Sequence, residues 1–372
     1  MIIKNAKVFT EEGTFQEQDI WIENDLFAVN GSSNEVLDAK GLYAVPGLTD
    51  IHFHGCVGYD FCDGTVEAIS AMADYEAKNG ITTICPATMT MSEETLLQIA
   101  HAAATYKNEA GSTLVGINME GPFISKEKKG AQNEAYIMAP SVELYYKLQD
   151  VSGYMFKLVS IAPEIKGASE FIKEVKDEVV ISIAHTTADY ECAKNALDMG
   201  ASHVTHLYNA MPTYNHRNPG VVGAASDSDT CTVELICDGI HIHPAVVKNT
   251  FRIFGSDRVV LISDSMMATG MEDGKYSLGG QSVTVTGKTA LLNDGTLAGS
   301  ASNLMDCVRV CVKEMGISLE QAIKSAAVNP AKAIGIYNQY GSITPGKVAN
   351  LVLLDEELRV REVFLKGKSI KH

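Results

Sequence analysis

The chain has 372 residues, of which 46% are hydrophobic and 20% are charged, the composition of an ordinary globular protein. Its formal net charge of -16 argues against a sequence-independent grip on nucleic acid or on an anionic membrane. No apolar stretch reaches membrane-spanning length, the first residues lack a signal-peptide pattern, and the eight cysteines form no C-x-x-C pair. We therefore expect a protein of the reducing cytoplasm that binds neither nucleic acid nor membrane.

The two ends of the chain carry short alternating apolar patterns and turn signals, which are typical of β-strands. They occur at residues 1–41, for example in "MIIKNAKVFT", and again in "GSITPGKVANLVLLDEELRVREVFLKGKSI" at 341–370. Because both ends are of the same kind, the sequence predicts one small β-sandwich built from residues 1–45 and 341–372. Residues 46–340 would form the larger domain.

The middle of the chain alternates short apolar runs with amphipathic helical segments, such as 92–107 and 188–200. Strands that alternate with helices favour parallel pairing, and near-continuous apolar strands favour burial on both faces. Eight such runs predict an α/β fold, a (β/α)8 TIM-like barrel. The runs are residues 42–55, 81–90, 114–123, 157–164, 179–187, 202–210, 231–241 and 258–266. Residues 276–298 interrupt the alternation and predict a β-hairpin insertion.

Residue types that bind metals or move protons recur where these strands end. In a barrel the C-terminal strand ends lie on one face, which holds the active site. A single strand-end histidine is more often an ordinary surface residue, but the joint placement of several predicts one site. These residues are His52 and His54 in the first run, Glu120 in the third, His185, His206 and His241 in the fifth to seventh, and Asp264 in the eighth. We assign no role to His101, His203, His216, His243 or His372.

The residue types at these strand ends favour a catalytic metal. Imidazole and carboxylate ligands suit Zn²⁺ or Fe²⁺, and no cysteine stands at these ends to form a structural site. His52 and His54 are two residues apart, so in a strand their rings point to the same side. That spacing suits a metal ion, but it also suits a half-buried strand with two polar residues.

The chain resembles the amidohydrolase superfamily, and within it the N-acetylglucosamine-6-phosphate deacetylases, over essentially its whole length. The resemblance rests on "PGLTDIHFHG", "NMEGPF", "KKGAQ", "AHTTA", "THLYNAM", "NPG", "DGIHIHP", "SDSM" and "GTLAGS". It implies metal-dependent hydrolysis of the N-acetyl group of N-acetylglucosamine-6-phosphate to glucosamine-6-phosphate and acetate, by metal-bound hydroxide. Asp264 would be the catalytic acid and base.

The resemblance also implies a set of metal ligands. Many superfamily members bridge two metals with a lysine on strand 4, but here that strand ends in "IAPE" and strand 3 supplies Glu120, as in the deacetylase group. Glu120, His185 and His206 would hold the main ion. Because some members keep His-x-His on strand 1 and others replace it, we expect His52 and His54 to bind a second, weaker ion, or to be kept without one. The cofactor is then one or two divalent ions per chain, zinc or iron.

By the same resemblance, twelve residues contact an amino-sugar 6-phosphate. They are Ala131, Asn209, Ala210, Arg217, Asp238, Gly239, Ile240, His241, Leu297, Ala298, Gly299 and Ser300. Arg217 offers phosphate a planar charged fork, and in a homodimer it reaches in from the neighbouring subunit. Gln132 stands where some relatives have a histidine, so its role in polarising the carbonyl stays open.

Three alternative functions remain beside deacetylation of N-acetylglucosamine-6-phosphate. N-acetylgalactosamine-6-phosphate differs from the first substrate only at C4, and the sequence does not separate the two. Hydrolysis of a cyclic amide or a dipeptide predicts a lysine at the end of strand 4, which is absent. A non-enzymatic assembly protein predicts lost ligands, whereas every candidate ligand is present.

Overall fold

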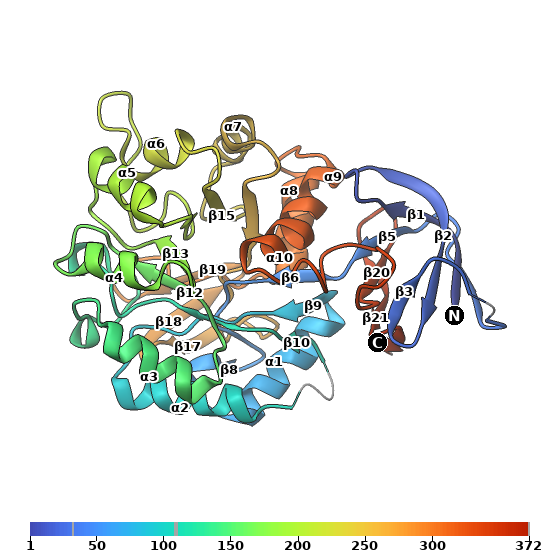
Figure 1. Ribbon diagram of the computed structural model, residues 1–372, viewed down its shortest axis with the longest axis horizontal. Helices are drawn as coiled ribbons and strands as arrows, with labels where there is room; N and C mark the ends of the chain where they lie inside the picture. Colours follow the sequence, from blue (N-terminus) through green and yellow to red (C-terminus); the bar gives the residue numbers. More distant parts are fainter. Residues whose placement is uncertain (32, 108–110, 371–372) are drawn as a thin grey trace.

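The structure is a computed structural model that describes residues 1–31, 33–107 and 111–370, and both chain ends lie in one sheet beside a larger body (Figure 1). This terminal sheet has the order β22-β21-β20-β5-β1-β2-β3, with β4 paired to β1. Its strands are β1 (Ile2–Phe9), β2 (Phe15–Glu23), β3 (Leu26–Ala28), β4 (Val36–Asp38), β5 (Tyr43–Pro46), β20 (Leu351–Leu354), β21 (Val360–Leu365) and β22 (Lys368–Ile370). Ile3, Ala44 and Leu353 belong to a core of its own. The strands expected at both ends therefore exist and pair with each other.

Each of the eight apolar runs contains a strand that pairs in parallel with a neighbour. These strands are β6 (Leu48–Asp50), β9 (Ile81–Ile84), β11 (Ile117–Met119), β12 (Phe156–Ile161), β13 (Val180–Ile183), β14 (His203–Val204), β15 (Thr232–Ile236) and β16 (Val259–Ile262). One parallel sheet runs from β11 to β16, and β9 pairs with β6 and with β10 (Thr113–Leu114). The α/β class is confirmed, and strands such as β9 and β16 are buried along their whole length.

Helices surround these parallel strands (Figure 1). They are α1 (Val66–Lys78), α2 (Glu93–Thr105), α3 (Val142–Ser152), α4 (Ala168–Val175), α5 (Tyr190–Met199), α6 (Gly220–Ser226), α7 (Pro244–Phe254), α8 (Leu304–Lys313), α9 (Leu319–Ile323) and α10 (Asn329–Ala333). Shorter pieces are η1 (Phe61–Asp63), η2 (Lys126–Lys128), η3 (Glu134–Tyr136), the π-helix η4 (Lys324–Val328), β7 (Gly55–Cys56) and β8 (Tyr59–Asp60). Polar caps begin many helices, as where Ser92 accepts the N–H of Thr95. Among the described residues, every helix is too short or too polar to span a bilayer.

The predicted insertion is a three-stranded antiparallel sheet of β17 (Gly274–Leu278), β18 (Gln281–Thr286) and β19 (Thr289–Leu292). Its buried side chains share a core with Met89 and Met266, which follow β9 and β16. The side-chain amide of Gln281 donates to the carbonyl of Ala131. The insertion therefore lies against the ends of the parallel strands, where the candidate site is found.

Candidate active site

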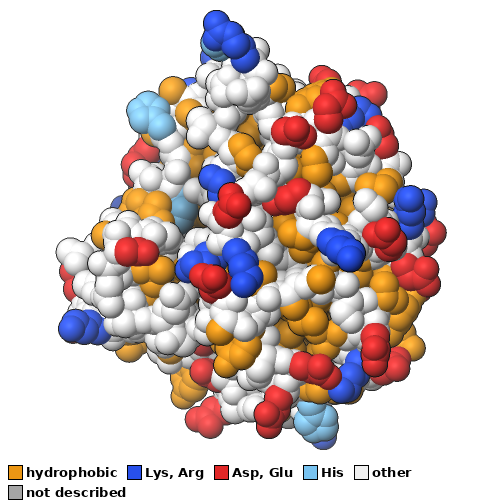
Figure 2. Space-filling view, turned by 90° about the vertical axis from the view of Figure 1, so that its left-hand side faces the viewer, with side chains coloured by type: hydrophobic (Ala, Val, Ile, Leu, Met, Phe, Trp, Pro, Cys, Tyr) orange, Lys and Arg blue, Asp and Glu red, His pale blue; other side chains and the backbone are white. Residues whose placement is uncertain are grey.

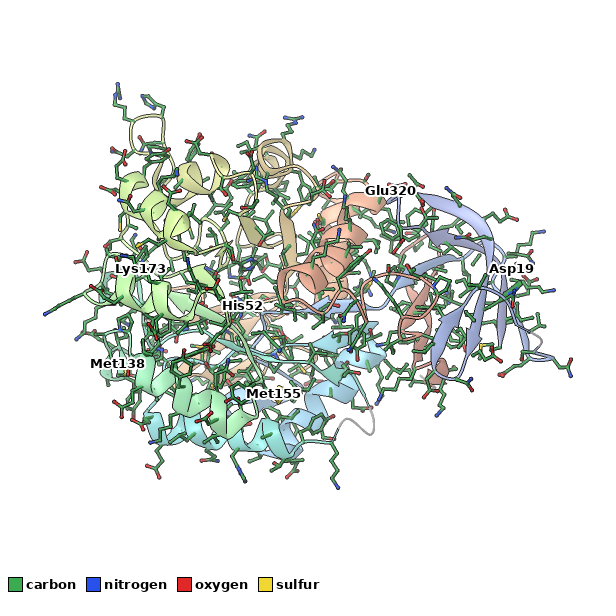
Figure 3. The ribbon with its side chains drawn as sticks, viewed as in Figure 1. Asp19, His52, Met138, Met155, Lys173 and Glu320 are labelled. Carbon is green, nitrogen blue, oxygen red and sulfur yellow. The ribbon has the colours of Figure 1, made fainter. Side chains whose placement is uncertain are left out.

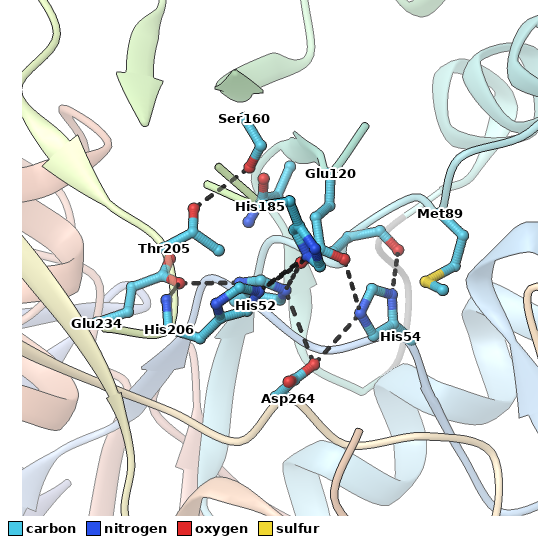
Figure 4. A network of polar contacts seen from close by, with 12 residues as sticks. His52, His54, Met89, Glu120, Ser160, His185, Thr205, His206, Glu234 and Asp264 are labelled. Carbon is cyan, nitrogen blue, oxygen red and sulfur yellow. Dashed lines mark hydrogen bonds and ion pairs between the residues drawn. The ribbon is translucent and has the colours of Figure 1, made fainter. Parts of the chain in front are cut away.

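The four histidines expected as metal ligands converge on Glu120, which follows β11 (Figure 4). Glu120 Oε1 lies 3.1 Å from His185 Nε2, 3.0 Å from His206 Nε2 and 3.3 Å from His52 Nε2. Glu120 Oε2 lies 3.2 Å from His54 Nε2. Figure 3 places His52 in the middle of the larger body, away from the terminal sheet that holds Asp19. The geometry brings together five residues that the sequence placed on four different strands.

Three of the four imidazoles are fixed by acceptors on the side away from Glu120. Nδ1 lies 2.9 Å from Glu234 Oε2 in His52, 3.3 Å from the Ala87 carbonyl in His54, and 2.8 Å from the Lys128 carbonyl in His185. Because these oxygens only accept, Nδ1 carries the proton in each ring, and a neutral ring then has its lone pair on Nε2. Three Nε2 lone pairs therefore point toward the carboxylate of Glu120.

The donor set fits a divalent cation. The Nε2 of His52 is buried and makes no hydrogen bond with the described residues. The Nε2 atoms of His185 and His206 face each other at 3.1 Å. Neutral rings in this arrangement present Nε2 lone pairs that have no proton between them to share. One metal ion can accept several of these lone pairs. The candidate ligands form two groups that share Glu120. Within each group the donor atoms lie within 4.8 Å of one another; the groups are His52, His54 and Glu120, and Glu120, His185 and His206.

The carboxylates of the cluster create a strong demand for positive charge. Burial by itself raises the pKa of Glu120, but the charge of His52 and the hydrogen bonds of His185 and His206 hold it well below its usual range. Burial by itself lowers the pKa of His54. Its hydrogen bonds to Asp264 and Glu120 outweigh burial and raise the pKa to about 10. Without a cation His52 and His54, whose pKa values are raised, therefore take up protons, and a metal ion that binds here would displace them.

Three functional side chains stand on backbone in the left-handed region. The φ angles are 42° for His185, 29° for His206 and 49° for Asp264. Such a φ costs free energy for residues other than glycine and persists where the surroundings hold it. The Asp264 turn is held on both sides, because its N–H donates to the His52 carbonyl at 2.9 Å and its carbonyl accepts from Ser300 N–H at 2.7 Å.

Asp264 stands at the junction of the cluster and an open cavity of about 310 Å³. Its Oδ1 lies 3.3 Å from His54 Nε2 and 3.8 Å from His52 Nε2. Burial raises the pKa of Asp264, but the hydrogen bond from His54 and the charge of His52 outweigh it, so the net pKa is below its usual value. Asp264 is therefore ionised and can accept a proton.

The cavity brings together much of the predicted site. Its lining includes His54, Glu120, His185, His206, Asp264, Ala131, Asn209, Ala210, His241, Leu297 and Gly299, together with Gln132 and with Leu278 of the insertion. Gln132 is fixed at both ends, since its Nε2 donates to Glu120 Oε2 at 2.7 Å and its Oε1 accepts from Thr90 N–H at 2.6 Å. In this arrangement Gln132 orients a metal-ligand candidate.

Other predicted substrate residues do not line this cavity. Asp238 accepts His241 Nδ1–H at 2.7 Å and the N–H of Ile240 at 2.9 Å, so it orients His241. Gly239, Ile240, Ala298 and Ser300 are not among its lining residues, and His52 is fully buried. The hydroxyl of Ser300 donates to the carbonyls of Ser263 and Ser302.

Arg217 is a predicted site residue that does not line this cavity. It is exposed and, with Tyr190 and Pro219, lines a different hollow. Figure 2 shows basic side chains interspersed with acidic ones on one face, without one broad basic patch. A phosphate contact by Arg217 within its own chain is therefore not seen, and its predicted reach from a second subunit stays a prediction.

Two residues of the site have no role in the sequence prediction. Glu234 lies in β15 and His203 in β14, and the two side chains are joined at 3.1 Å between Nε2 and Oε1. Of the other histidines without a predicted role, His372 lies outside the described residues. A signal for Glu234 was available, because a charged residue inside the apolar run "CTVELIC" must find a buried partner.

Comparisons with known proteins agree with this geometry. The sequence model described as "Amidohydrolase family" matches residues 43–370. An N-acetylglucosamine-6-phosphate deacetylase of Bacillus subtilis (strain 168) is 37% identical, over 99% of this chain and 96% of its own. An N-acetylgalactosamine-6-phosphate deacetylase of Escherichia coli O157:H7 is 30% identical, over 99% and 98%. The crystal structure of N-acetylglucosamine-6-phosphate deacetylase from Pasteurella multocida superposes with a TM-score of 0.93 at 29% identity, covering 100% of this chain and 99% of that one.

Proposed function

The chain belongs to the amidohydrolase family, and from this premise we propose that it hydrolyses the N-acetyl group of N-acetylglucosamine-6-phosphate, releasing acetate and glucosamine-6-phosphate. The observation that carries the proposal is the convergence of four imidazoles on Glu120 at the wall of an open cavity. That arrangement suits metal-assisted hydrolysis of an amide. Relatives of this activity, similar along nearly the whole chain, support the substrate.

Glu120, His185 and His206 would hold the main divalent cation, and His52 and His54, sharing Glu120, a second one. When bound, the cation lowers the pKa of a water molecule and polarises the amide carbonyl. Imidazole and carboxylate donors without a thiolate favour Zn²⁺ or Fe²⁺, one or two ions per chain. Gln132 keeps Glu120 in place through its 2.7 Å hydrogen bond.

Asp264 would move the proton that the reaction requires. An amide nitrogen leaves poorly unless it is protonated, so one group must take a proton from water and deliver it as the C–N bond breaks. Asp264 is ionised and stands at the cavity wall, 3.3 Å from His54. We assign it both steps, as base first and as acid afterwards.

The sugar phosphate would be held by the remaining cavity wall. Asn209 and Ala210 offer amide and backbone groups, and His241 offers a ring that Asp238 orients at 2.7 Å. Arg217 lines a different hollow of its own chain, so its phosphate contact requires a second subunit. A homodimer is therefore part of the proposal.

We also infer that the eight parallel strands close into one barrel. An isolated parallel bridge joins Ala87 to Asn118 between β9 and β11, and the backbone bond from Asp264 to His52 joins β16 to β6. Both contacts lie where the two parallel sheets meet. The division into residues 1–45, 46–340 and 341–372 and the cytoplasmic location remain predictions.

A second candidate is the galacto substrate, because one relative of similar coverage is an N-acetylgalactosamine-6-phosphate deacetylase. The cyclic-amide alternative has no such support. Glu164, which ends the fourth predicted run, accepts the N–H and the hydroxyl of Thr187 at 2.6 and 2.9 Å, so strand 4 offers no ligand to the cluster.

Acetate release from the metal-replete protein tests the proposal. We expect hydrolysis of N-acetylglucosamine-6-phosphate with a kcat/KM above that for N-acetylgalactosamine-6-phosphate, and far above that for unphosphorylated N-acetylglucosamine. The reverse order of the two phosphates would assign the galacto substrate. No acetate from any of the three would refute a deacetylase acting on hexosamines.

A further inference from the structure

Glu234 is a fully buried carboxylate in the middle of β15, with 0% of the residue exposed. Its oxygens accept from three groups of the site: Oε2 from His52 Nδ1–H at 2.9 Å and from His206 N–H at 3.0 Å, and Oε1 from His203 Nε2–H at 3.1 Å. A buried charge persists only where several donors compensate for its lost hydration. Both oxygens of Glu234 meet that condition.

The contact to His52 has a consequence for the opposite side of the ring. A carboxylate can only accept, so the proton of a neutral His52 stands on Nδ1 and the lone pair on Nε2. That Nε2 lies 3.3 Å from Glu120 and 3.8 Å from Asp264. Carboxylates behind a ligating histidine orient the ring and increase its basicity.

The contact chain continues beyond Glu234. His203 Nε2 faces Glu234 Oε1, and His203 Nδ1 lies 2.5 Å from the hydroxyl of Thr232. His203 is fully buried and holds the far oxygen of Glu234, which keeps the near oxygen on His52. The series Thr232, His203, Glu234, His52 therefore runs from β14 and β15 to the ligand cluster.

Glu76 shows that a buried carboxyl in this protein is not always held in this way. It lies in α1 with 0% exposure, and neither of its oxygens accepts a hydrogen bond from a nitrogen or oxygen donor among the described residues. Burial raises the pKa of Glu76 well above its usual value. Glu234 differs in having three donors aimed at it.

We propose that Glu234 is the positioning residue of the second metal site: it fixes the tautomer and orientation of His52 and adds a buried negative charge behind it. This inference rests on the proposed function, because it needs the two metal sites. The main site depends on Glu234 less, since its ring nitrogens do not touch this carboxylate. His206 contacts it only through the backbone N–H.

The test is a Zn²⁺ titration of the metal-free, full-length protein with a competing chromophoric chelator, which gives one affinity for each ion. Glu234→Gln keeps an amide oxygen for His206 N–H and removes the charge. We expect the second-ion affinity to fall about 10- to 100-fold and the first-ion affinity by less than about threefold. Glu76→Gln, the matched loss of a buried carboxyl, should leave both affinities unchanged.

A second variant gives an independent answer if Glu234→Gln does not fold. His203→Phe keeps an aromatic ring at this position and removes the donor that holds Glu234 Oε1. It should also weaken the second ion selectively. Unchanged second-ion affinity in the folded variant, or equal weakening of both ions, overturns the positioning role. Wild-type protein that binds one ion only overturns the second site itself, while the acetate assay still reports on the proposed function separately.

Discussion

The two pairs of histidines in the cluster are built in different ways. The β6 pair, His52 and His54, follows one strand with a spacing of two residues, and neither residue has a positive φ. The β13–β14 pair, His185 and His206, comes from two strands, and both residues stand on left-handed backbone. The β6 pair is therefore arranged by local strand geometry, and the β13–β14 pair by two strained turns that the surrounding fold must hold.

The pairs also differ in their access to the cavity and in the partners of their Nδ1 atoms. Both rings of the β13–β14 pair line the cavity, whereas His52 is completely buried and only His54 reaches the wall. Behind His52 lies the carboxylate of Glu234, while the Nδ1 of His206 is buried and has no hydrogen-bond partner in the part of the chain that the structure describes. Both rings of the β13–β14 pair therefore face the cavity, whereas only one ring of the β6 pair does.

The largest effect is expected at the β13–β14 pair. His206→Ala removes a ligand that shares Glu120 with His185, so the main ion and the activity should be lost together. Metal analysis and acetate release measure this. His101→Ala, an exposed histidine on α2, is the matched control and should change neither. A fully active His206→Ala enzyme without bound metal would contradict the comparison.

Asp264→Asn tests the junction between the two pairs. Loss of the proton carrier should lower kcat by about 10²- to 10⁴-fold, with metal and substrate still bound. Asp74→Asn breaks only an exposed ion pair with Lys78 and should leave kcat unchanged. If Asp264→Asn keeps a near-normal kcat, or is inactive only because it lacks metal, the proton-transfer role is wrong.

Arg217→Ala asks whether this arginine, reaching in from a second subunit, binds the phosphate of the substrate. A charge-assisted hydrogen bond contributes about 1.5–3 kcal/mol, so KM for the 6-phosphate should rise about 10- to 100-fold. The KM for the unphosphorylated sugar serves as the internal control and should stay the same. An equal rise for both sugars would remove Arg217 from the phosphate site.

The mildest loss of activity is expected from the double variant His52→Ala/His54→Ala. Metal-replete wild-type protein should hold close to two ions per chain, and the double variant close to one. Because the β13–β14 pair and Asp264 remain, part of the activity should persist. One ion per chain in both proteins, under metal excess, would show that the β6 pair is not a metal site.

The sequence predicted most of the elements and the ligand candidates for physical reasons that act locally. Strands such as 81–84 and 259–262 are apolar along their length because both faces are buried, so the runs are visible without the structure. His52 and His54 are similarly readable, because a spacing of two in an extended segment fixes their common side. The resemblance of "NMEGPF" to the deacetylase group pointed to Glu120 in place of a strand-4 lysine.

Only the tertiary structure decided which residues orient the candidate metal ligands. Glu234 is 182 residues from His52, and Gln132 reaches both Glu120 and Thr90. No periodicity relates such residues, since each meets its partner only when separate strands and loops pack together. Arg217 shows the same limit: the resemblance implied a phosphate contact from a neighbouring subunit, and within its own chain the fold places Arg217 in a different hollow. The sequence by itself thus determined which side chains stand at the strand ends, because that follows from local pattern. The packing of distant strands determined which of them touch and what orients each one, because hydrogen bonds act only over a few ångströms.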